Sequence, residues 1–443
     1  MNKKLKTISL INLGCPKNQV DGERVFADYA QKGYILSNLE DAQFLLINTC
    51  AFIKPAVSES LKFIKQASRW KREGLLKRIL VMGCLPQRFK EKLKEEYPEI
   101  DDLIYRDFVC ALEEKDVPRV LSTFPYAYLK IAEGCNRECS FCLIPQLRGK
   151  YRSLPSELLL KEARGLREMG IQELVLVAQD TTYWGIDLKG KSLLLELLDS
   201  ISRIGFPWIR LLYLHPQLVD KEFLISLKSI PGLVPYLDIP LQHVDSKILS
   251  LMKRGQKEKD VRQMVELVRT LWPEAVLRST FIVGFPGEGE KEFQKLLNFL
   301  EEARFERLAV FPFYPEEGAQ ATFFEGQVEE KERINRYNQV LNLQKEIYLS
   351  KNKELLGKKV LVLIDRLEGE TSIGRTFRDA PEIDCQIKIK GSLKSGAFYP
   401  ACVTKAHIYS LIGKMEKEGE NAEEGSFWAS EADRSLFSSN RDK

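Results

Sequence analysis

Short apolar runs alternate with amphipathic stretches along the first 122 residues. The three clearest apolar runs are Thr7 to Leu13, Phe44 to Asn48 and Ile79 to Met82. Stretches with helical spacing follow them, including Asp21 to Lys32 and Pro55 to Lys71. Because this β-α alternation is typical of a parallel, doubly wound sheet, residues 1–122 are predicted to form an N-terminal α/β domain.

A cysteine lies just after each of these three runs. They are Cys15, Cys50 and Cys84, at nearly equal spacing. Parallel strands point the same way, so these cysteines are expected to meet at the sheet edge where open α/β sheets bind ligands. A single cysteine is more often a small buried residue. Three at equivalent positions favour shared ligation of a metal or an iron–sulfur cluster.

Six further strand-like runs and five helical patterns fill the region from 126 to 325. The runs are Ala127 to Ile131, Glu173 to Val177, Trp208 to Tyr213, Val234 to Ile239, Val276 to Val283 and Leu308 to Phe313. The helical patterns are Ser156 to Met169, Ser192 to Arg203, Asp220 to Ser229, Asp260 to Leu271 and Gly289 to Ala303. Six β-α units predict a partial (β/α)6 barrel, which with a helix over Glu329 to Leu356 forms a domain of residues 126–356.

Polar residues follow the predicted barrel strands, at the C-terminal mouth where function is expected. They are Cys135, Cys139 and Cys142 after the first strand, Gln179, Asp180 and Thr181 after the second, His215 after the third, Gln242 and His243 after the fourth, and Gly284 to Glu288 after the fifth. The mouth is therefore polar where the strands are apolar.

The hydrophobic pattern changes again after Gly357. Three short alternating runs, Lys359 to Ile364, Asp384 to Ile389 and Ala401 to Ile408, predict a small antiparallel β barrel over residues 357–413. Beyond Gly413 the chain is rich in Glu, Lys, Ser and Asn, so residues 414–443 are predicted to form a disordered tail.

The composition indicates which cellular compartment and which kinds of binding partner suit this protein. The chain has 67 basic and 63 acidic residues, so its net charge of +4 indicates no global attraction to nucleic acid. Nine cysteines and no recognisable leader favour a reducing cytoplasm over secretion. No apolar run approaches the roughly 18 residues of a membrane span. In such a compartment, clustered cysteines favour metal or redox chemistry over disulfides.

The stretch from Lys130 to Cys142 places three cysteines at C-x3-C-x2-C directly after a strand. Three soft thiolates favour an iron–sulfur centre or zinc. Structural zinc needs four protein ligands, and His215 or His243 could supply the fourth. A three-cysteine cluster with one open iron is the stronger interpretation, and that iron must bind something other than protein.

This spacing at the end of the first strand of a six-unit barrel resembles the radical S-adenosylmethionine superfamily. The resemblance implies that Cys135, Cys139 and Cys142 hold a 4Fe-4S cluster whose open iron binds S-adenosylmethionine. In such enzymes the cofactor carries the radical chemistry, while the protein positions and shields it.

With its N-terminal cysteines and a terminal barrel of the TRAM type, the chain resembles the methylthiotransferases over residues 1 to about 413. The resemblance implies that Cys15, Cys50 and Cys84 hold a second 4Fe-4S cluster, which carries the sulfur to be inserted. S-adenosylmethionine would then serve both as methyl donor and as radical source. A sulfur donor and a reductant such as a flavodoxin or ferredoxin are the implied partners.

Several stretches are similar to the branch that modifies an aspartate of small-subunit ribosomal protein number twelve (RimO type). They are Leu13 to Asp21, Ile144 to Ser153, Ala178 to Thr182, Gly374 to Thr376 and Asp379 to Asp384. The branch implies methylthio insertion at the β-carbon of that aspartate. Two alternatives are the same chemistry on a tRNA adenosine and a non-catalytic iron–sulfur, RNA-binding assembly factor. Gly22, Cys385 and Ser410 depart from the branch pattern without removing a cluster cysteine.

Other mouth residues carry weaker expectations. Gln179, Asp180, Asp238 and Gln242 are expected to hydrogen-bond the cofactor. Gly284 and Gly287 either allow close approach of the backbone to the cofactor or form a turn that starts a helix. Arg148 and Arg152 either bind substrate carboxylates or phosphates or belong to a solvated loop.

Acidic residues of the terminal domain suggest a docking surface. Asp379, Glu382 and Asp384 would suit a basic ribosomal protein better than phosphates. Reversal of these three charges is therefore expected to weaken capture of the substrate protein.

Overall fold

The structure is a computed structural model, and it describes residues 6–105 and 119–415. The predicted disordered tail lies outside the described residues from residue 416 onward. Lys414 and Met415 belong to the last strand, so the terminal barrel extends two residues beyond the predicted boundary.

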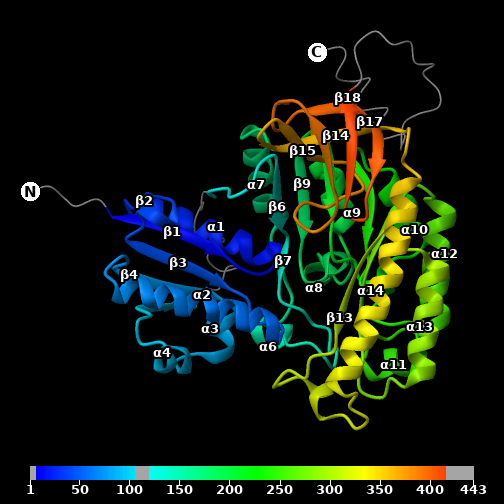
Figure 1. The fold of residues 1–443 in the computed structure, drawn as a ribbon, viewed down its shortest axis with the longest axis horizontal. Coiled ribbons are helices and arrows are strands. Elements are labelled where there is room, and N and C mark those ends of the chain that lie inside the picture. Colours follow the sequence, from blue (N-terminus) through cyan, green and yellow to red (C-terminus); the bar gives the residue numbers. More distant parts are fainter. Residues whose placement is uncertain (1–5, 106–118, 416–443) are drawn as a thin grey trace, which may run out of the picture.

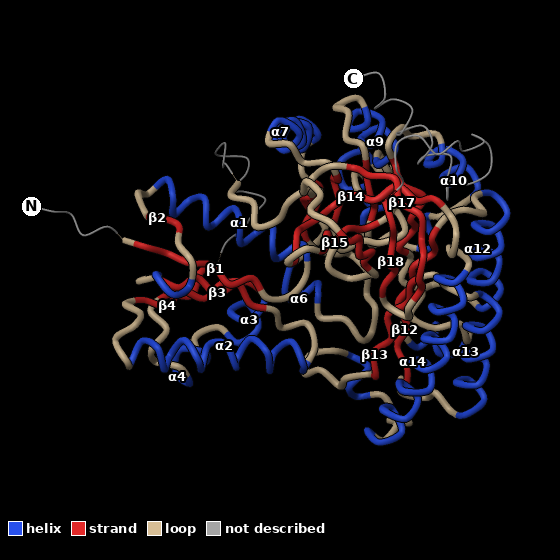
Figure 2. Tube along the Cα trace, turned by 45° about the horizontal axis from the view of Figure 1, so that its top comes forward, coloured by secondary structure: helices blue, strands red, loops and turns tan. Residues whose placement is uncertain are grey.

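The N-terminal domain is a five-stranded parallel sheet in the order β2-β1-β3-β4-β5, which confirms the doubly wound prediction. Its strands are β1 Thr7–Asn12, β2 Ile35–Leu36, β3 Phe44–Thr49, β4 Arg78–Gly83 and β5 Asp102–Ile104. Its helices are α1 Pro16–Gln31, α2 Lys54–Arg72, α3 Cys84–Phe89 and α4 Lys92–Glu96, with a 3-10 turn at Leu39–Asp41. Helices α1 and α2 cover opposite faces of the sheet (Figure 2), so the central strand β3 is buried along its whole length.

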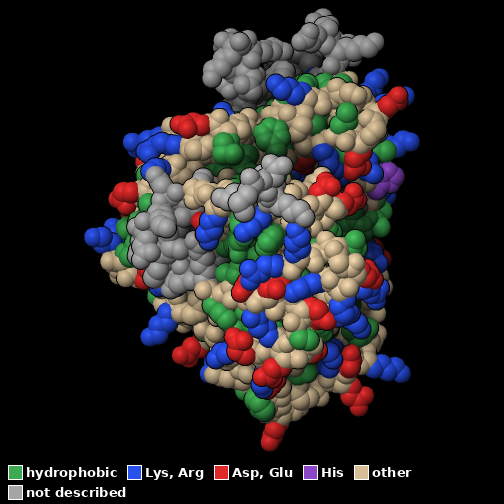
Figure 3. Space-filling model, turned by 90° about the vertical axis from the view of Figure 1, so that its left-hand side faces the viewer, with side chains coloured by type: hydrophobic (Ala, Val, Ile, Leu, Met, Phe, Trp, Pro, Cys, Tyr) green, Lys and Arg blue, Asp and Glu red, His purple; other side chains and the backbone are tan. Residues whose placement is uncertain are grey.

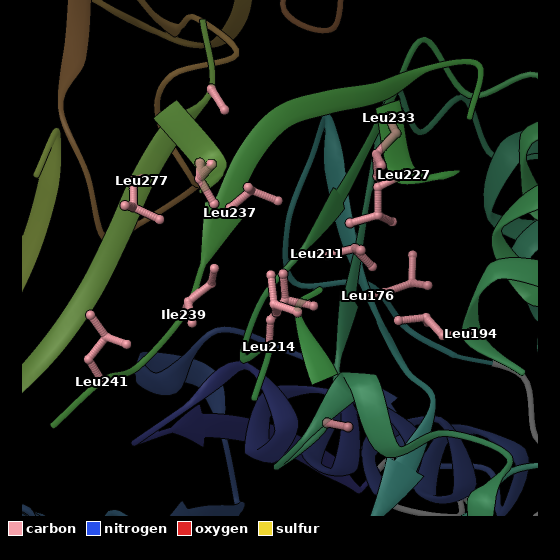
Figure 4. Packing of buried hydrophobic residues seen from close by; sticks show 14 of the residues in the cluster. Leu176, Leu194, Leu211, Leu214, Leu227, Leu233, Leu237, Ile239, Leu241 and Leu277 are labelled. Atoms are coloured by element: carbon pink, nitrogen blue, oxygen red, sulfur yellow. The ribbon is translucent and has the colours of Figure 1, made fainter. Parts of the chain in front are cut away.

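The central domain is a six-stranded parallel sheet in the sequential order β6-β9-β10-β11-β12-β13, as predicted. These strands are β6 Tyr126–Lys130, β9 Glu173–Val177, β10 Trp208–Leu211, β11 Leu233–Asp238, β12 Val276–Val283 and β13 Arg307–Pro312. The outer helices are α7 Ser156–Glu168, α9 Leu194–Ser202, α10 Lys221–Lys228, α12 Glu258–Leu271 and α13 Glu290–Ala303. Their apolar faces pack on the sheet, largely through leucines (Figure 4).

Shorter elements stand at the mouth of this barrel. They are β7 Ala132–Glu133 paired with β8 Arg152–Ser153, helices α6 Ile144–Arg148, α8 Ile186–Lys189 and α11 Ser246–Leu251, and 3-10 turns at Thr181–Tyr183, Pro216–Leu218 and Gln320–Phe323. Strands β6 and β13 remain the edges of the sheet, so the barrel is open on one side.

Parts from outside the sheet cover the two open edges. Helix α1 of the N-terminal domain packs against β6, and helix α14 Glu330–Lys353 packs against β13 (Figure 1). Val20 of α1 joins the hydrophobic cluster inside the barrel. The N-terminal domain is therefore part of the barrel wall, and its helix α1 points into the mouth.

The C-terminal domain is a closed five-stranded barrel in the order β14-β15-β16-β18-β17. Its strands are β14 Lys359–Glu368, β15 Thr371–Arg375, β16 Gln386–Lys390, β17 Phe398–Ala406 and β18 Ser410–Met415. All pairs are antiparallel except β16 with β18, which is parallel.

Two of these strands, β15 and β18, were missed in the sequence because each contains a glycine. A Cβ on Gly374 would lie 2.5 Å from the carbonyl oxygen of Leu363, and one on Gly413 would lie 2.9 Å from Ile387. The small barrel needs this close approach, although glycine weakens the sequence signal of a strand.

The loop between β15 and β16 fills the end of the partial barrel opposite the mouth. Its Asp379 is buried against Arg307 of β13, and its Asp384 accepts a hydrogen bond of 2.5 Å from the hydroxyl of Tyr236. Glu382 accepts a hydrogen bond of 3.0 Å from Tyr128. The predicted acidic docking surface is therefore wrong for Asp379 and Asp384, which hold the terminal domain to the barrel interior, whereas Glu382 is exposed.

The surface carries interleaved charges. On the face shown in Figure 3, Lys and Arg side chains alternate with Asp and Glu over the N-terminal domain, in keeping with the small net charge. Among residues 6–105 and 119–415, no helix has both the length and the apolar character that a membrane crossing requires.

Candidate active site

The three N-terminal cysteines come together at the carboxyl edge of their sheet. Cys15 precedes α1, Cys50 follows β3, and Cys84 begins α3. Gly14 has φ +97°, and a Cβ there would lie 3.3 Å from the sulfur of Cys50. Burial and the neighbouring Cys84 raise the pKa of Cys50 to about 12. The three side chains form the N-terminal triad.

Asn18 connects the segments that carry this triad. Its side-chain amide donates to the carbonyl of Thr49 at 2.8 Å and to that of Leu13 at 3.2 Å. Its side-chain oxygen accepts from the thiol of Cys84 at 3.9 Å. Asn18 is fully buried, so one side chain fixes residues next to or within all three cysteine loops.

The loop after β6 holds the second group of cysteines, the loop triad of Cys135, Cys139 and Cys142. The backbone N–H of Arg137 donates to the sulfur of Cys135 at 3.3 Å, and that of Ile144 donates to Cys142 at 3.4 Å. Burial raises the pKa of Cys142 to about 12. These donors favour the thiolate form that a metal binds and so offset part of the effect of burial.

A buried arginine contacts the third sulfur of this loop, that of Cys139. The guanidinium of Arg254 lies 3.6 Å from the sulfur of Cys139 and donates to the carbonyl of Pro240 at 2.7 Å. A cavity of about 510 Å³ lies along the outer side of the loop. Its lining includes all three cysteines, so the loop triad is reachable from outside.

The six cysteines fit two four-iron clusters better than single metal ions. All six are free thiols. Within the described part of the chain, no three His, Cys, Asp or Glu side chains are close enough to hold one ion. Three thiolates of a four-iron cluster bind three different iron atoms, so their sulfurs stand farther apart. The zinc alternative with His215 or His243 is not supported.

Both mouth histidines have other partners. The Nδ1 atom of His215 accepts from the backbone N–H of Gln217, and burial together with Arg254 lowers its pKa to about 2. The Nδ1 atom of His243 accepts from the N–H of Asp245, and its Nε2 lies 3.2 Å from Glu288. His215 is therefore a neutral wall residue at ordinary pH.

Four buried charges join the two triads, and we call them the bridging quartet: Asp21, Lys130, Glu133 and Arg148. Lys130 pairs with Asp21 of α1 and with Glu133 at 2.8 Å. Arg148 pairs with Asp21 at 2.9 Å and with the side-chain oxygen of Asn18. Although burial opposes it, Lys130 and Arg148 hold the pKa of Glu133 at about 2. The quartet is charge-balanced and fixes the N-terminal domain to the cysteine loop.

Arg148, which the sequence predicted as a substrate ligand, is paired with the carboxylates of the bridging quartet. Its guanidinium is buried between two carboxylates, so it does not belong to a solvated loop. Arg152 is half-buried and shares with Arg148 the lining of a cavity of about 300 Å³ between the two domains. A role of either arginine in substrate binding stays a prediction.

The predicted cofactor ligands on the strand ends all lie at the mouth. Gln179 donates to Glu133 at 3.2 Å, and its carbonyl oxygen is buried without a partner. Asp180 accepts two bonds from Arg137, at 3.2 and 3.1 Å. Asp238 is paired with Arg278 at 2.8 Å.

Backbone conformation marks the remaining predicted ligands. Gln242 adopts φ +74° beside β12, and Gly284 and Gly287 adopt φ +68° and +83°. A Cβ on Gly284 would lie 2.3 Å from the Arg333 side chain of α14. The close approach at Gly284 is therefore made by α14, and the turn leads into α13. A cofactor contact of these three residues stays a prediction.

Sequence reasoning missed four residues that the structure brings to the mouth: Lys17, Asn18, Arg137 and Arg254. Lys17 is buried, with its ammonium 3.5 Å from the ring centre of Tyr213. Lys17 and Asn18 stand in the Leu13 to Asp21 stretch, so their nearness to Cys15 was a usable signal. Arg254 lies far from the cysteine loop in sequence, and only the fold reveals its contact.

Comparison with known families agrees with this arrangement. Residues 7–104 match the uncharacterized protein family UPF0004, residues 129–300 match the radical SAM superfamily, and residues 356–415 match the TRAM domain. The chain is 40% identical to the ribosomal protein uS12 methylthiotransferase RimO of Thermoanaerobacter sp. (strain X514) over 437 residues, which cover 93% of this chain and all of the relative. It is 41% identical to the enzyme of that name from Chlorobaculum tepidum over 422 residues, which cover 92% of this chain and 97% of the relative.

A solved structure supports the fold. The radical S-adenosylmethionine methyltransferase TsrM from Kitasatospora setae, with tryptophan and a cofactor analogue bound, superposes with a TM-score of 0.51 at 13% identity. The superposition covers 70% of this chain and 73% of TsrM.

Proposed function

Because the chain belongs to the RimO family of ribosomal protein uS12 methylthiotransferases, we propose that it inserts a methylthio group at the β-carbon of an aspartate of uS12. The observation that carries this proposal is the pair of cysteine triads that face one barrel mouth. Identity of 40% and 41% over nearly the full length of uS12 enzymes does not favour the tRNA alternative, and two cysteine triads at one mouth do not favour a non-catalytic assembly factor.

The residues present fit two 4Fe-4S clusters and S-adenosylmethionine. The N-terminal triad would hold the sulfur-carrying cluster, and the loop triad would hold the radical-generating cluster. When bound, these groups supply the sulfur, the methyl group and the radical that activates the substrate C–H bond. Among the predicted ligands, Gln179 is the best placed to accept a hydrogen bond from the cofactor, because its side-chain carbonyl oxygen is buried without a partner.

The protein itself contributes position and shielding. The bridging quartet and Asn18 hold the N-terminal triad against the mouth, and the Arg137–Asp180 pair ties the cysteine loop to the next strand end. Buried, paired charges keep their geometry better than solvated ones, because any shift would leave a charge uncompensated.

Partners and compartment complete the proposal. An electron donor such as a flavodoxin or ferredoxin would approach through the outer cavity beside Cys135, where the loop triad is reachable. A sulfur donor would supply the N-terminal triad. Six free thiols in two metal-ready groups suit a reducing cytoplasm, where ribosomal proteins are made.

The assay that tests this function is anaerobic turnover of the reconstituted protein with S-adenosylmethionine, reductant and sulfide. We expect uS12 to gain a methylthio group at one aspartate by mass spectrometry, while tRNA stays unmodified. Product on tRNA alone would contradict the proposal, and so would a complete absence of cofactor cleavage.

Asn18→Ala is expected to impair the N-terminal triad selectively. It removes the side chain that joins all three cysteine segments, so reconstituted iron and sulfide should fall toward the content of one cluster. The measurement is chemical iron analysis with electron paramagnetic resonance. Asn335→Ala, on the exposed face of α14, is the matched control and should keep both clusters. Full cluster content in Asn18→Ala would show that the cysteines alone organise the site.

A further inference from the structure

A lysine ammonium stands at the mouth between the two triads. Lys17 is the second residue of α1, two positions after Cys15. Its side chain is 8% exposed. Its ammonium contacts Tyr213, which follows β10 at the mouth of the barrel. The charged end of Lys17 therefore lies at the mouth.

This ammonium has an aromatic neighbour and no counter-ion. It lies 3.5 Å from the ring centre of Tyr213. Within residues 6–105 and 119–415, no carboxylate pairs with it and no acceptor takes its hydrogen bonds. Asp238 is the nearby acid of the mouth, but one of its oxygens accepts from Arg278 at 2.8 Å and the other from the N–H of Tyr213 at 3.0 Å. Lys17 keeps three donors available.

The other mouth cations are already engaged. Arg148 and Lys130 belong to the bridging quartet, and Arg137 pairs with Asp180 at 3.1 Å. Arg254 contacts the sulfur of Cys139 and the carbonyl of Pro240. A buried cation without a partner is costly, and a carboxylate brought by a ligand would remove that cost.

We propose that Lys17 is the specificity-determining residue that binds the carboxylate of the target aspartate, an inference that rests on the proposed function. The reacting β-carbon is bonded directly to the carboxylate carbon. An ion pair that holds the carboxylate therefore also limits the position of the β-carbon, which is one bond away. Tyr213 holds the ammonium in place by a cation–π contact. The residue two positions after Cys15 thus contacts the substrate next to the N-terminal triad.

The test compares two enzymes and two substrate proteins. Holoenzymes with Lys17 or with Lys17→Met are assayed on uS12 carrying either aspartate or asparagine at the target position. Methionine keeps most of the length and the apolar packing on Tyr213 but not the charge. Wild-type enzyme should favour the aspartate protein. Lys17→Met should lose about 30-fold or more in kcat/KM on that protein, which is roughly 2 kcal/mol, and should lose the preference for aspartate.

Further variants and a binding measurement distinguish a loss of substrate recognition from a loss of folding. Lys17→Arg should restore most of the aspartate preference, and Lys331→Met, on the exposed surface of α14, should not change it. Anaerobic calorimetry with the aspartate and asparagine proteins should give the same pattern in Kd. Unchanged preference in Lys17→Met would overturn the proposal, as would an equal loss on both proteins without rescue by arginine. If wild-type enzyme modifies neither protein, the proposed function itself fails and takes this inference with it.

Discussion

Cys139→Ala is expected to abolish reductive cleavage of S-adenosylmethionine, whereas Cys50→Ala is expected to abolish methylthio transfer and leave cleavage in place. Cys139 belongs to the loop triad, which the barrel itself positions through Arg254. Cys50 belongs to the N-terminal triad, whose loops come from a different sheet. Because the triads sit on separate sheets, loss of one sulfur should not dismantle the other group. The measurements are 5′-deoxyadenosine release and methylthio product, each by mass spectrometry.

Cys402→Ala provides the matched control for this pair. Cys402 lies in β17 of the terminal barrel, is half-buried and belongs to neither triad. Both cofactor cleavage and transfer should survive its replacement. If Cys50→Ala also stops cleavage, the two triads act as one unit, and the division of labour between them is wrong.

The strands of the two parallel sheets that carry the cysteines, and the six triad cysteines themselves, were predictable from the sequence because both signals are local. Strands buried on two faces read as continuous apolar runs, as in Phe44 to Asn48. Cys15, Cys50, Cys84 and Cys135 each follow such a run within a few residues, and Cys139 and Cys142 lie on the same loop as Cys135. Parallel topology converts equal spacing along the chain into nearness in space. Sequence periodicity and one geometric rule therefore predicted how the cysteines group.

The partners of charged residues were not predictable, because they are set across long distances in sequence. Asp379 looked like a surface acid until the fold placed Arg307 against it. Arg148 looked like a loop residue until the packing of α1 brought Asp21 to it. Neither pairing leaves a periodic signal. The residues that govern how domains meet are thus the ones that pattern analysis misses.

Glu173→Gln is expected to release the terminal barrel from the central domain. Glu173 is fully buried at the start of β9, between Arg210 at 2.6 Å and Arg375 of β15 at 2.5 Å. Loss of its charge leaves Arg210 without a carboxylate partner and Arg375 with Asp365 alone, which costs about 3 kcal/mol. Hydrogen exchange should report this change in peptides from Thr371–Arg375, where opening should become about 100-fold more frequent.

The ionisation of Glu173 determines how the stability of this interface changes in acid. Burial opposes ionisation, but Arg210 and Arg375 together hold the pKa of Glu173 below its usual value. A lowered pKa stabilises the folded state above the unfolded value of about 4.3, and that contribution is lost as pH falls through the folded pKa. The difference in protection between wild type and Glu173→Gln should therefore be full at neutral pH and shrink in acid.

Glu196→Gln is the matched control, because its pair with Lys191 is a solvent-exposed contact of 3.8 Å on α9. Such surface pairs contribute about 0–1 kcal/mol, so exchange in β15 should not change. Protection of β15 that is equal in wild type and Glu173→Gln at neutral pH would mean that apolar packing alone joins the domains. Trp208, which contacts Phe398 edge-to-face with 4.9 Å between ring centres, would then carry that role. The two explanations separate by pH, because only the ionic one weakens in acid.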